Sequence, residues 1–388
     1  FLVMSVIIVL SSKFIGRSLS KAVVITDIAI LVSAFFTLKS PLGLILPLGY
    51  SVFAFSAISL IINQYRDYKN YTALEILCYL FFFPKIFAGP IDRVDDFVRQ
   101  LRGKKKPTLK KLYLPIKMCI FACFYKFVIA DRLYILCNDD YDGLNEVCSI
   151  LCYGVAFFFD FYAYSIFAIA FGKLLGIDLP ENFDSPYCSR TFRDFWKKWN
   201  VTLGTWLRDY IYIPLGGNRV GKVRHALNIM ITFLVSGLWH GASWDFICWG
   251  IFHGFFMVLE RLGLGRILEK TKVVKHVYTI LVLCVGWTFF RVGDVGLTLQ
   301  YLKRMFLPWM YTASGYAVQE LVTNRAFFVA ACGILGCGLL QKAAVKIMPR
   351  TEKFKNSTVE LVFCMLLLVY SVMLMVSSTY SAFIYMNF

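Results

Sequence analysis

The sequence predicts an all-α fold, that of a polytopic integral membrane protein. Of its 388 residues, 59% are hydrophobic and only 17% are charged, whereas soluble domains carry about 25% charged residues. Apolar runs recur along the whole chain instead of forming one block. We therefore expect roughly 9–11 transmembrane or re-entrant helices. They would form a single membrane-embedded domain over residues 1–388, in a multi-pass protein of the cell membrane.

The expected helices follow the apolar runs in order. They lie near residues 22–37, 42–62, 73–90, 112–130, 147–175, 226–245, 246–261, 277–290, 326–346 and 359–383. Several are shorter than the about 20 residues that cross a bilayer upright, which predicts tilted or re-entrant pieces buried by their neighbours. Pro84, Gly89 and Pro90 interrupt the run at 73–90, so we expect this segment not to cross.

Short clusters of Lys and Arg between the apolar runs are typical of cytoplasmic loops. The clusters are at residues 99–111, 189–198, 218–225, 261–275 and 346–355. The acidic segment 137–146 is then expected outside. Because the basic residues are distributed in this way, the formal charge of +17 indicates membrane topology, and no nucleic-acid partner is expected.

Reactive and charged side chains inside the apolar runs have structural interpretations. Most of the twelve cysteines lie within apolar runs, where cysteine behaves as a small hydrophobic residue. No metal site is predicted from them. Asp160 is an intramembrane charge, for which pairing with an arginine or a backbone donor and a catalytic role are both open.

Two histidines stand in the strongly apolar segment 236–254. An imidazole at membrane depth costs free energy unless it is hydrogen-bonded or functional, so His240 and His253 are functional candidates. Gly237 and Gly241 flank the first of them and permit close approach of a substrate or a neighbouring helix. For each histidine, a hydrogen bond to a neighbouring helix is the structural alternative.

The segment 191–219 mixes aromatic and charged residues at a density unlike that of a lipid-facing helix. Its Trp and Tyr side chains predict an interfacial belt, with basic side chains at the cytoplasmic surface. These residues are Trp196, Trp199, Trp206 and Tyr210, and Arg193, Lys197, Lys198 and Arg208. A belt of this kind can be an anchor alone. A basic funnel would also attract an acidic donor, such as the phosphates of a coenzyme A thioester or an acidic carrier protein.

Blocks of sequence that keep their order over most of the chain carry a family resemblance. They are residues 46–66, 82–93, 124–131, 157–219, 237–254 and 286–291. Through them the sequence resembles the membrane-bound O-acyltransferase family, within it the branch of the alginate O-acetylation membrane protein, with the D-alanyl lipoteichoic acid transfer protein as a near relative. Measured against this family, the chain is expected to lack the first one or two helices.

The resemblance implies roles for particular residues. The family's central histidine falls on His240, and its second signature position falls on Asn200. At that position the alginate-type motif has His, and other members often have Asn or Asp. An amide can orient a substrate by hydrogen bonds but does not take up a proton. The residues expected to bind substrate are Trp199, Arg208, Trp239, Asp209, Trp206 and His253.

The implied reaction moves an acyl group, foremost acetyl, through a central tunnel. The donor is acetyl-CoA, another acyl-CoA or an acyl carrier protein in the cytoplasm, and no tightly bound cofactor is expected. His240 takes the proton of the acceptor hydroxyl. An extracytoplasmic acyltransferase partner completes transfer to a polysaccharide. The expected location is a bacterial inner (cytoplasmic) membrane.

Alternatives from the sequence remain open. Residues 89–93 (GPIDR) and 124–127 (FYKF) favour D-alanyl transfer to teichoic acids, whereas residues 212–219 (YIPLGGNR) favour the alginate type. A proton-coupled transporter or flippase would use the buried histidine as a relay, but such proteins usually show internal repeats, and none is evident. An inactive membrane scaffold is the remaining alternative, because of Asn200.

Overall fold

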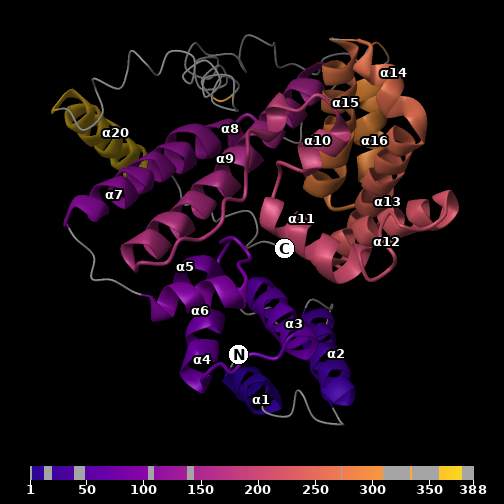
Figure 1. The fold of residues 1–388 in the computed structure, drawn as a ribbon. Coiled ribbons are helices and arrows are strands. Elements are labelled where there is room, and N and C mark those ends of the chain that lie inside the picture. The colour runs from indigo at the N-terminus through magenta and orange to yellow at the C-terminus, as the bar shows by residue number, and fades with distance from the viewer. Residues whose placement is uncertain are drawn as a thin grey trace. The chain divides into compact units, whose positions relative to one another are not determined.

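Helices make up all the regular structure that we describe (Figure 1). The computed structural model describes residues 2–12, 20–38, 49–103, 109–137, 144–271, 273–307 and 358–377, together with residues 309 and 333. No strand occurs in these ranges. The predicted all-α class is therefore confirmed.

Two compact units divide the chain. Unit 1 comprises Phe1–Ile116, Tyr164–Asn182 and Thr202–Pro214, and unit 2 comprises Lys117–Ala163, Phe183–Val201 and Leu215–Phe388. Each unit gathers segments that are distant in sequence. We describe each by itself.

Four helical segments among the described residues are long and apolar enough to span a bilayer. They are Lys111–Tyr134, Glu146–Leu174, Trp244–Leu268 and Thr358–Ser377. In a bilayer, a helix satisfies its own backbone hydrogen bonds, which is why these apolar runs are helical. These segments agree with the expected runs at 112–130, 147–175, 246–261 and 359–383, and the chain is a polytopic membrane protein. The expected helix at 326–346 lies outside the described residues, apart from Gly333.

Unit 1 begins with a set of helices from the first hundred residues. They are α1 (Leu2–Ser12), α2 (Ser20–Leu38), α3 (Tyr50–Arg66), α4 (Ala73–Leu80), α5 (Phe83–Ile86) and α6 (Val94–Arg102). Helix α2 packs against α3, and α4 against α6. The run at 73–90 is broken as the sequence predicts, because α4 ends at Leu80 and α5, which contains Pro84, ends at Ile86.

Unit 2 contains a buried charge cluster at a π-helical turn. Helix α7 (Leu109–Cys123), which begins in unit 1, continues as η1 (Phe124–Ala130) and α8 (Asp131–Tyr134). In η1, the Lys126 Nζ lies 2.8 Å from Oδ1 of Asp131 and 2.8 Å from Oδ1 of Asp160. Asp160 belongs to the long helix α9 (Leu144–Leu174). Its buried carboxylate thus pairs with a lysine, which the sequence did not identify as its partner.

Helices α12 (Lys222–His240) and α13 (Trp244–Leu259) form a closely packed hairpin in unit 2. A Cβ built on Gly237 would lie 2.2 Å from the carbonyl oxygen of Phe246, and one on Gly250 would lie 2.6 Å from that of Phe233. Backbone therefore meets backbone at both glycines, as small residues permit. Of the two interpretations of Gly237, the structure supports approach by a neighbouring helix.

The hairpin turns earlier than expected. The sequence placed the boundary between residues 245 and 246, whereas α12 ends at His240 and α13 starts at Trp244. The polar and small residues within 240–245 mark the turn, with Ser243 at the N-cap of α13 and Asp245 in its first turn, and the expected boundary lay at the far end of this stretch. At Gly241 the backbone becomes extended, with a φ of −180°, and this ends α12.

Further helices complete the described structure. In unit 2 they are η2 (Pro186–Cys188), α10 (Phe192–Trp196), η4 (Glu260–Leu264), α14 (Gly265–Glu269), α15 (Val274–Val292), α16 (Val295–Phe306) and α20 (Thr358–Ser377). Helix α15 packs against α13 and α16, and α20 against η1. Helix α11 (Val201–Leu207) leads into η3 (Arg208–Tyr212), which belongs to unit 1.

Replacing Gly237 with Ala is expected to destabilise the hairpin by about 1–3 kcal/mol, the usual cost of overpacking, because the new methyl group would meet backbone. The measurement is thermal unfolding of the detergent-purified protein. Gly221→Ala is the matched control, since a Cβ there meets nothing within 4 Å. Equal melting temperatures for the two variants would contradict the close backbone approach.

Candidate active site

His240 is the last residue of α12 and lies in a box of aromatic rings. The centroid of its ring is 4.5 Å from that of Trp239, 4.8 Å from Phe290, 5.1 Å from Trp249 and 5.8 Å from Phe246. We call these four side chains the aromatic box. They come from α12, α13 and α15, and the residue is only 7% exposed. The box thus gives a titratable ring a largely apolar, water-poor surrounding.

A continuous series of ring contacts links the box to Trp199. The Phe290 ring is 5.1 Å from that of Phe157 on α9, and the Phe157 ring is 5.5 Å from that of Trp199. Trp199 also lies 5.1 Å from Trp287 on α15. These side chains are buried. Segments far apart in sequence therefore converge on one aromatic core around the histidine.

Asn200 follows Trp199 directly and precedes α11. Its φ of 44° is in the left-handed region, which asparagine tolerates better than most residues with a side chain. The residue is 8% exposed. The backbone of Asn200 is therefore held in an uncommon conformation next to Trp199, and this conformation by itself restricts which residue types fit at the position.

His253 lies in the second half of α13. Its side chain packs between aromatic rings. It stacks on Phe192 at 5.1 Å with an interplanar angle of 9°, and it meets Trp196 and Trp249 edge to face at 5.1 and 4.4 Å. A Cβ on Gly286 would lie 2.5 Å from this ring. No described group hydrogen-bonds to either ring nitrogen. The Trp249 ring lies in contact with both histidines.

Trp206 packs in the core of unit 1. Its indole nitrogen donates to the Phe55 carbonyl oxygen at 3.0 Å, and its ring lies 4.4 Å from that of Phe55 and 5.0 Å from that of Tyr210. The same unit holds Thr202, whose hydroxyl donates to Asn182 Oδ1 and accepts from the backbone N–H of Ile91. These contacts anchor the start of α11 within unit 1.

Arg208 and Asp209, in η3, also belong to unit 1. Asp209 accepts from Arg208 Nε at 2.9 Å through one oxygen and from Arg93 Nη2 at 2.7 Å through the other. Arg93 also lies over the Tyr210 ring, 4.8 Å from its centroid. No feature of the sequence indicated that Arg93, the last residue of GPIDR, pairs with Asp209. Arg208 keeps an exposed side chain, with a relative exposure of 59%.

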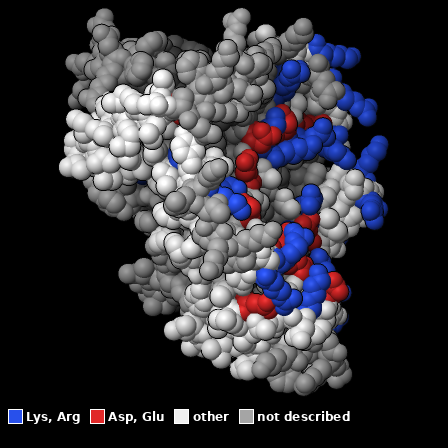
Figure 2. All heavy atoms as spheres, turned by 60° about the vertical axis from the view of Figure 1, so that its left-hand side comes forward, with Lys and Arg blue, Asp and Glu red and all other residues white. Residues whose placement is uncertain are grey.

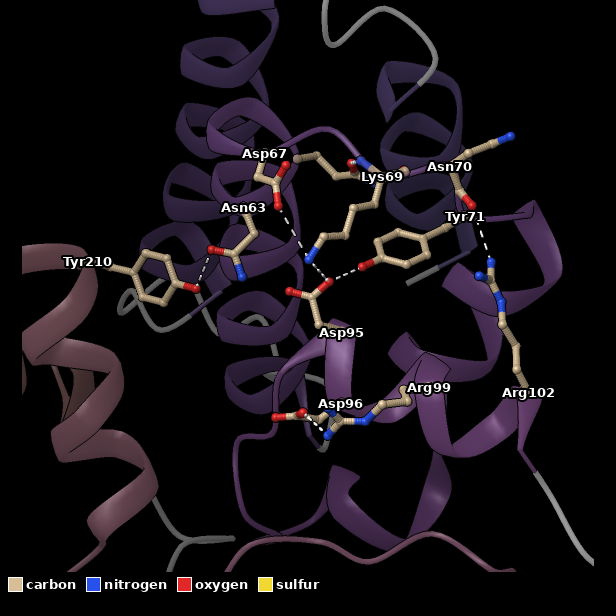
Figure 3. A network of polar contacts seen from close by, with 11 residues as sticks. Asn63, Asp67, Lys69, Asn70, Tyr71, Asp95, Asp96, Arg99, Arg102 and Tyr210 are labelled. Carbon is tan, nitrogen blue, oxygen red and sulfur yellow. Dashed lines mark hydrogen bonds and ion pairs between the residues drawn. The ribbon is translucent and has the colours of Figure 1, made fainter.

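A polar network occupies the end of α3 and the start of α6 in unit 1 (Figure 3). Lys69 Nζ lies 2.9 Å from Asp95 Oδ1 and 3.4 Å from Asp67 Oδ2, and the Tyr71 hydroxyl donates to Asp95. The hydrogen bond with Asp95 raises the pKa of Lys69. Beside this cluster, Tyr210 donates to Asn63 Oδ1 at 2.9 Å (Figure 3).

Further along α6, Arg102 forms two hydrogen bonds with Glu75, at 2.6 and 2.9 Å. These bonds lower the pKa of Glu75 to about 2, so that the carboxylate is ionised at any physiological pH. Figure 2 shows Lys and Arg side chains lying directly beside Asp and Glu side chains. Two basic residues of the expected funnel are paired in the same manner, Lys198 with Asp194 and Arg208 with Asp209.

Each residue predicted for the site can thus be placed. His240, Trp239, Trp199 and His253 join one connected set of ring contacts in unit 2, and Asn200 is adjacent to it in the chain. Trp206, Arg208 and Asp209 belong to unit 1. Sequence reasoning did not single out Phe290 and Trp249, although both stand in matched blocks. Within the described residues, no three His, Cys, Asp or Glu side chains converge as metal ligands.

Comparison with known proteins identifies the family. The family model of the membrane-bound O-acyltransferases matches residues 30–290. This range covers more than half of the chain and includes His240 and its aromatic box. The chain belongs to the membrane-bound O-acyltransferase family.

Relatives of three kinds match the chain. The probable alginate O-acetylase AlgI of Pseudomonas putida is 35% identical over 270 residues, covering 68% of this chain and 56% of the relative. The peptidoglycan O-acetyltransferase of Helicobacter pylori is 34% identical, covering 60% and 46%. The teichoic acid D-alanyltransferase of Streptococcus thermophilus is 34% identical, covering 61% and 62%. The chain thus spans about half the length of the curated relatives it matches.

Proposed function

We propose that this membrane-bound O-acyltransferase transfers an acyl group, foremost acetyl, from a cytoplasmic thioester towards hydroxyl groups of an extracytoplasmic polysaccharide. The observation that carries the proposal is the placement of His240 inside the aromatic box. A buried imidazole at membrane depth is a functional candidate by default. Two kinds of relative, an alginate O-acetylase and a peptidoglycan O-acetyltransferase, support acetyl as the group that is transferred.

The proposed chemistry is general-base catalysis. A hydroxyl is a poor nucleophile at neutral pH, and a neutral imidazole is the usual acceptor for its proton. His240 takes that proton as the hydroxyl oxygen attacks the thioester carbonyl carbon. The tetrahedral intermediate then collapses, the carbon–sulfur bond breaks, and the thiolate leaves with the proton from the imidazolium. The apolar rings around His240 keep out water that would hydrolyse the thioester instead.

The other predicted residues receive distinct roles in this proposal. Asn200 orients the carbonyl or the acceptor by hydrogen bonds from its amide. Trp239, Trp199 and His253 shape the acyl site through their ring contacts. Donor binding by Trp206, Arg208 and Asp209 stays a prediction. Donor and acceptor meet in a tunnel, and an extracytoplasmic partner completes the transfer, as the family resemblance implies.

D-alanyl transfer to teichoic acid is the second candidate. Identity to the D-alanyltransferase of Streptococcus thermophilus is 34%, against 35% for AlgI of Pseudomonas putida, so similarity alone does not separate the two donors. The buried Lys126 also stands in FYKF, one of the two blocks that favour this branch. Mass spectrometry of ester-linked groups on the envelope polymers of the producing cell distinguishes acetyl from alanyl.

Replacing His240 with Ala is expected to lower thiol release from acetyl-CoA by at least about a hundredfold, the lower end of what a general base contributes. The assay uses the purified protein in lipid vesicles with a hydroxyl acceptor. His276→Ala is the control, because this ring contacts the Ser189 carbonyl outside the aromatic box. Equal rates for the two variants, both correctly inserted in the membrane, would refute the role of His240 as the general base. A wild-type protein without any acyl transfer would favour the transporter or scaffold alternatives.

A pair of variants distinguishes the role of the Asn200 side-chain amide from the role of its backbone conformation. Alanine in the left-handed region costs about 1 kcal/mol, whereas glycine adopts it freely. We expect Asn200→Ala and Asn200→Gly to lose activity to a similar extent, because both lack the amide. The measurement is the same thiol-release rate. If Asn200→Gly retains the wild-type rate, the residue serves only the backbone and has no orienting role.

A further inference from the structure

A pocket of about 320 Å³ opens in unit 2 at the start of α12. Helix α12 begins at Lys222 and ends at His240, about 27 Å apart at 1.5 Å per residue. The pocket is therefore remote from the aromatic box, and the proposed acyl transfer makes no use of it. Its lining combines basic side chains with aliphatic ones.

Helical spacing places one face of each hairpin helix on the pocket. From α12, Lys222, His225 and Ile229 line it, at positions i, i+3 and i+7. From the facing helix, Val258 and Leu262 line it, at positions i and i+4. Residues at these intervals share a helix face. The two faces oppose each other because α12 and α13 are packed side by side.

A bend at Gly263 adds a second arginine to the wall. Arg261 and Arg266 both line the pocket, yet five residues of a regular helix turn by about 500°, which would leave them about 140° apart around its axis. Gly263 has a φ of 145°, and the helix is broken at this residue. A Cβ there would meet nothing within 4 Å, so glycine is needed for the conformation and not for space.

The positive charge in the pocket is not neutralised by described carboxylates. No Asp or Glu whose side chain is described forms an ion pair within 4.0 Å with Lys222, Arg261 or Arg266, in contrast to the paired charges of unit 1. Burial, and then the charge of Arg261, lowers the pKa of His225. The positive potential of the pocket therefore comes from Lys222, Arg261 and Arg266, as an anion site requires.

The pocket lining changes from basic side chains at the end of the hairpin to aliphatic side chains further along it. Lys222 and His225 lie in the first turn of α12, and Arg261 and Arg266 lie at the corresponding end of the antiparallel partner. Ile229 and Val258 follow on the side that leads into the hairpin. Free phosphate would use the cations but leave the aliphatic wall uncovered. A phospholipid satisfies both, with its phosphate among the cations and its acyl chain on the wall.

We propose that this pocket binds the headgroup of an anionic phospholipid of the surrounding leaflet. Basic pockets between membrane helices are suited to such headgroups. Both segments that contribute, 218–225 and 261–275, were expected on the cytoplasmic side from their charge. The lipid would join the start of α12 to the end of the facing helix, and so hold the hairpin at the end opposite His240.

The test measures binding of phosphatidylglycerol to the full chain, purified in a neutral detergent and freed of lipid, by native mass spectrometry and by the shift in melting temperature. Arg261→Gln combined with Arg266→Gln is expected to weaken binding about thirtyfold, from about 1 kcal/mol for each basic residue at a membrane surface. Arg224→Gln combined with Lys270→Gln removes the same charge outside the pocket lining and is expected to bind as the wild type does.

Three outcomes would overturn the proposal. The first is equal loss of binding in both double variants, which would mean attraction by total charge alone. The second is equal binding of phosphatidylcholine and phosphatidylglycerol to the wild type, which needs no variant to fold. The third is full displacement of the lipid by millimolar inorganic phosphate, or the same melting shift with phosphate alone, since either would identify a site for free anions.

Discussion

The arrangement around His240 depends on one packing constraint, the contact of α12 with α13 through backbone at Gly237 and Gly250. Because no side chain separates the helices there, the hairpin is narrow and the turn after His240 is short. That turn brings Trp249 and Phe246 of the returning helix against the imidazole. The surroundings of His240 therefore depend on a helix–helix contact at two glycines that are not themselves proposed to bind substrate.

The same hairpin has two ends of opposite character. At one end, aromatic rings surround His240 and leave it little access to water. At the other end, basic and aliphatic side chains line a pocket. Gly263 bends the chain so that Arg261 and Arg266 both line this pocket. Elsewhere in unit 2, the buried pairing of Lys126 with two aspartates ties η1 to α9. Removing one partner of such a pair lowers the stability of the fold, because it leaves an unpaired buried charge.

Sequence reasoning predicted the features that depend on local composition. Pro84 lacks a backbone N–H, so the break near it was predictable, and the apolar runs gave the long helices. It failed where the partner is remote in sequence. Nothing in the chain indicates that Lys126 pairs with Asp160 or that Phe290 packs on His240. The left-handed backbone of Asn200 was also not predictable, because Asn is enriched in this conformation but only a small share of residues with a side chain adopt it.

The most direct measurement is a structure of the protein with a non-hydrolysable acetyl-CoA analogue, in which a thioether replaces the thioester. The account predicts that the acyl end of the analogue enters the aromatic box, with space beside His240 for a hydroxyl within about 3 Å of a ring nitrogen. An analogue bound elsewhere, with the His240 ring still closed in by Trp249 and Phe290, would contradict the role assigned to this histidine.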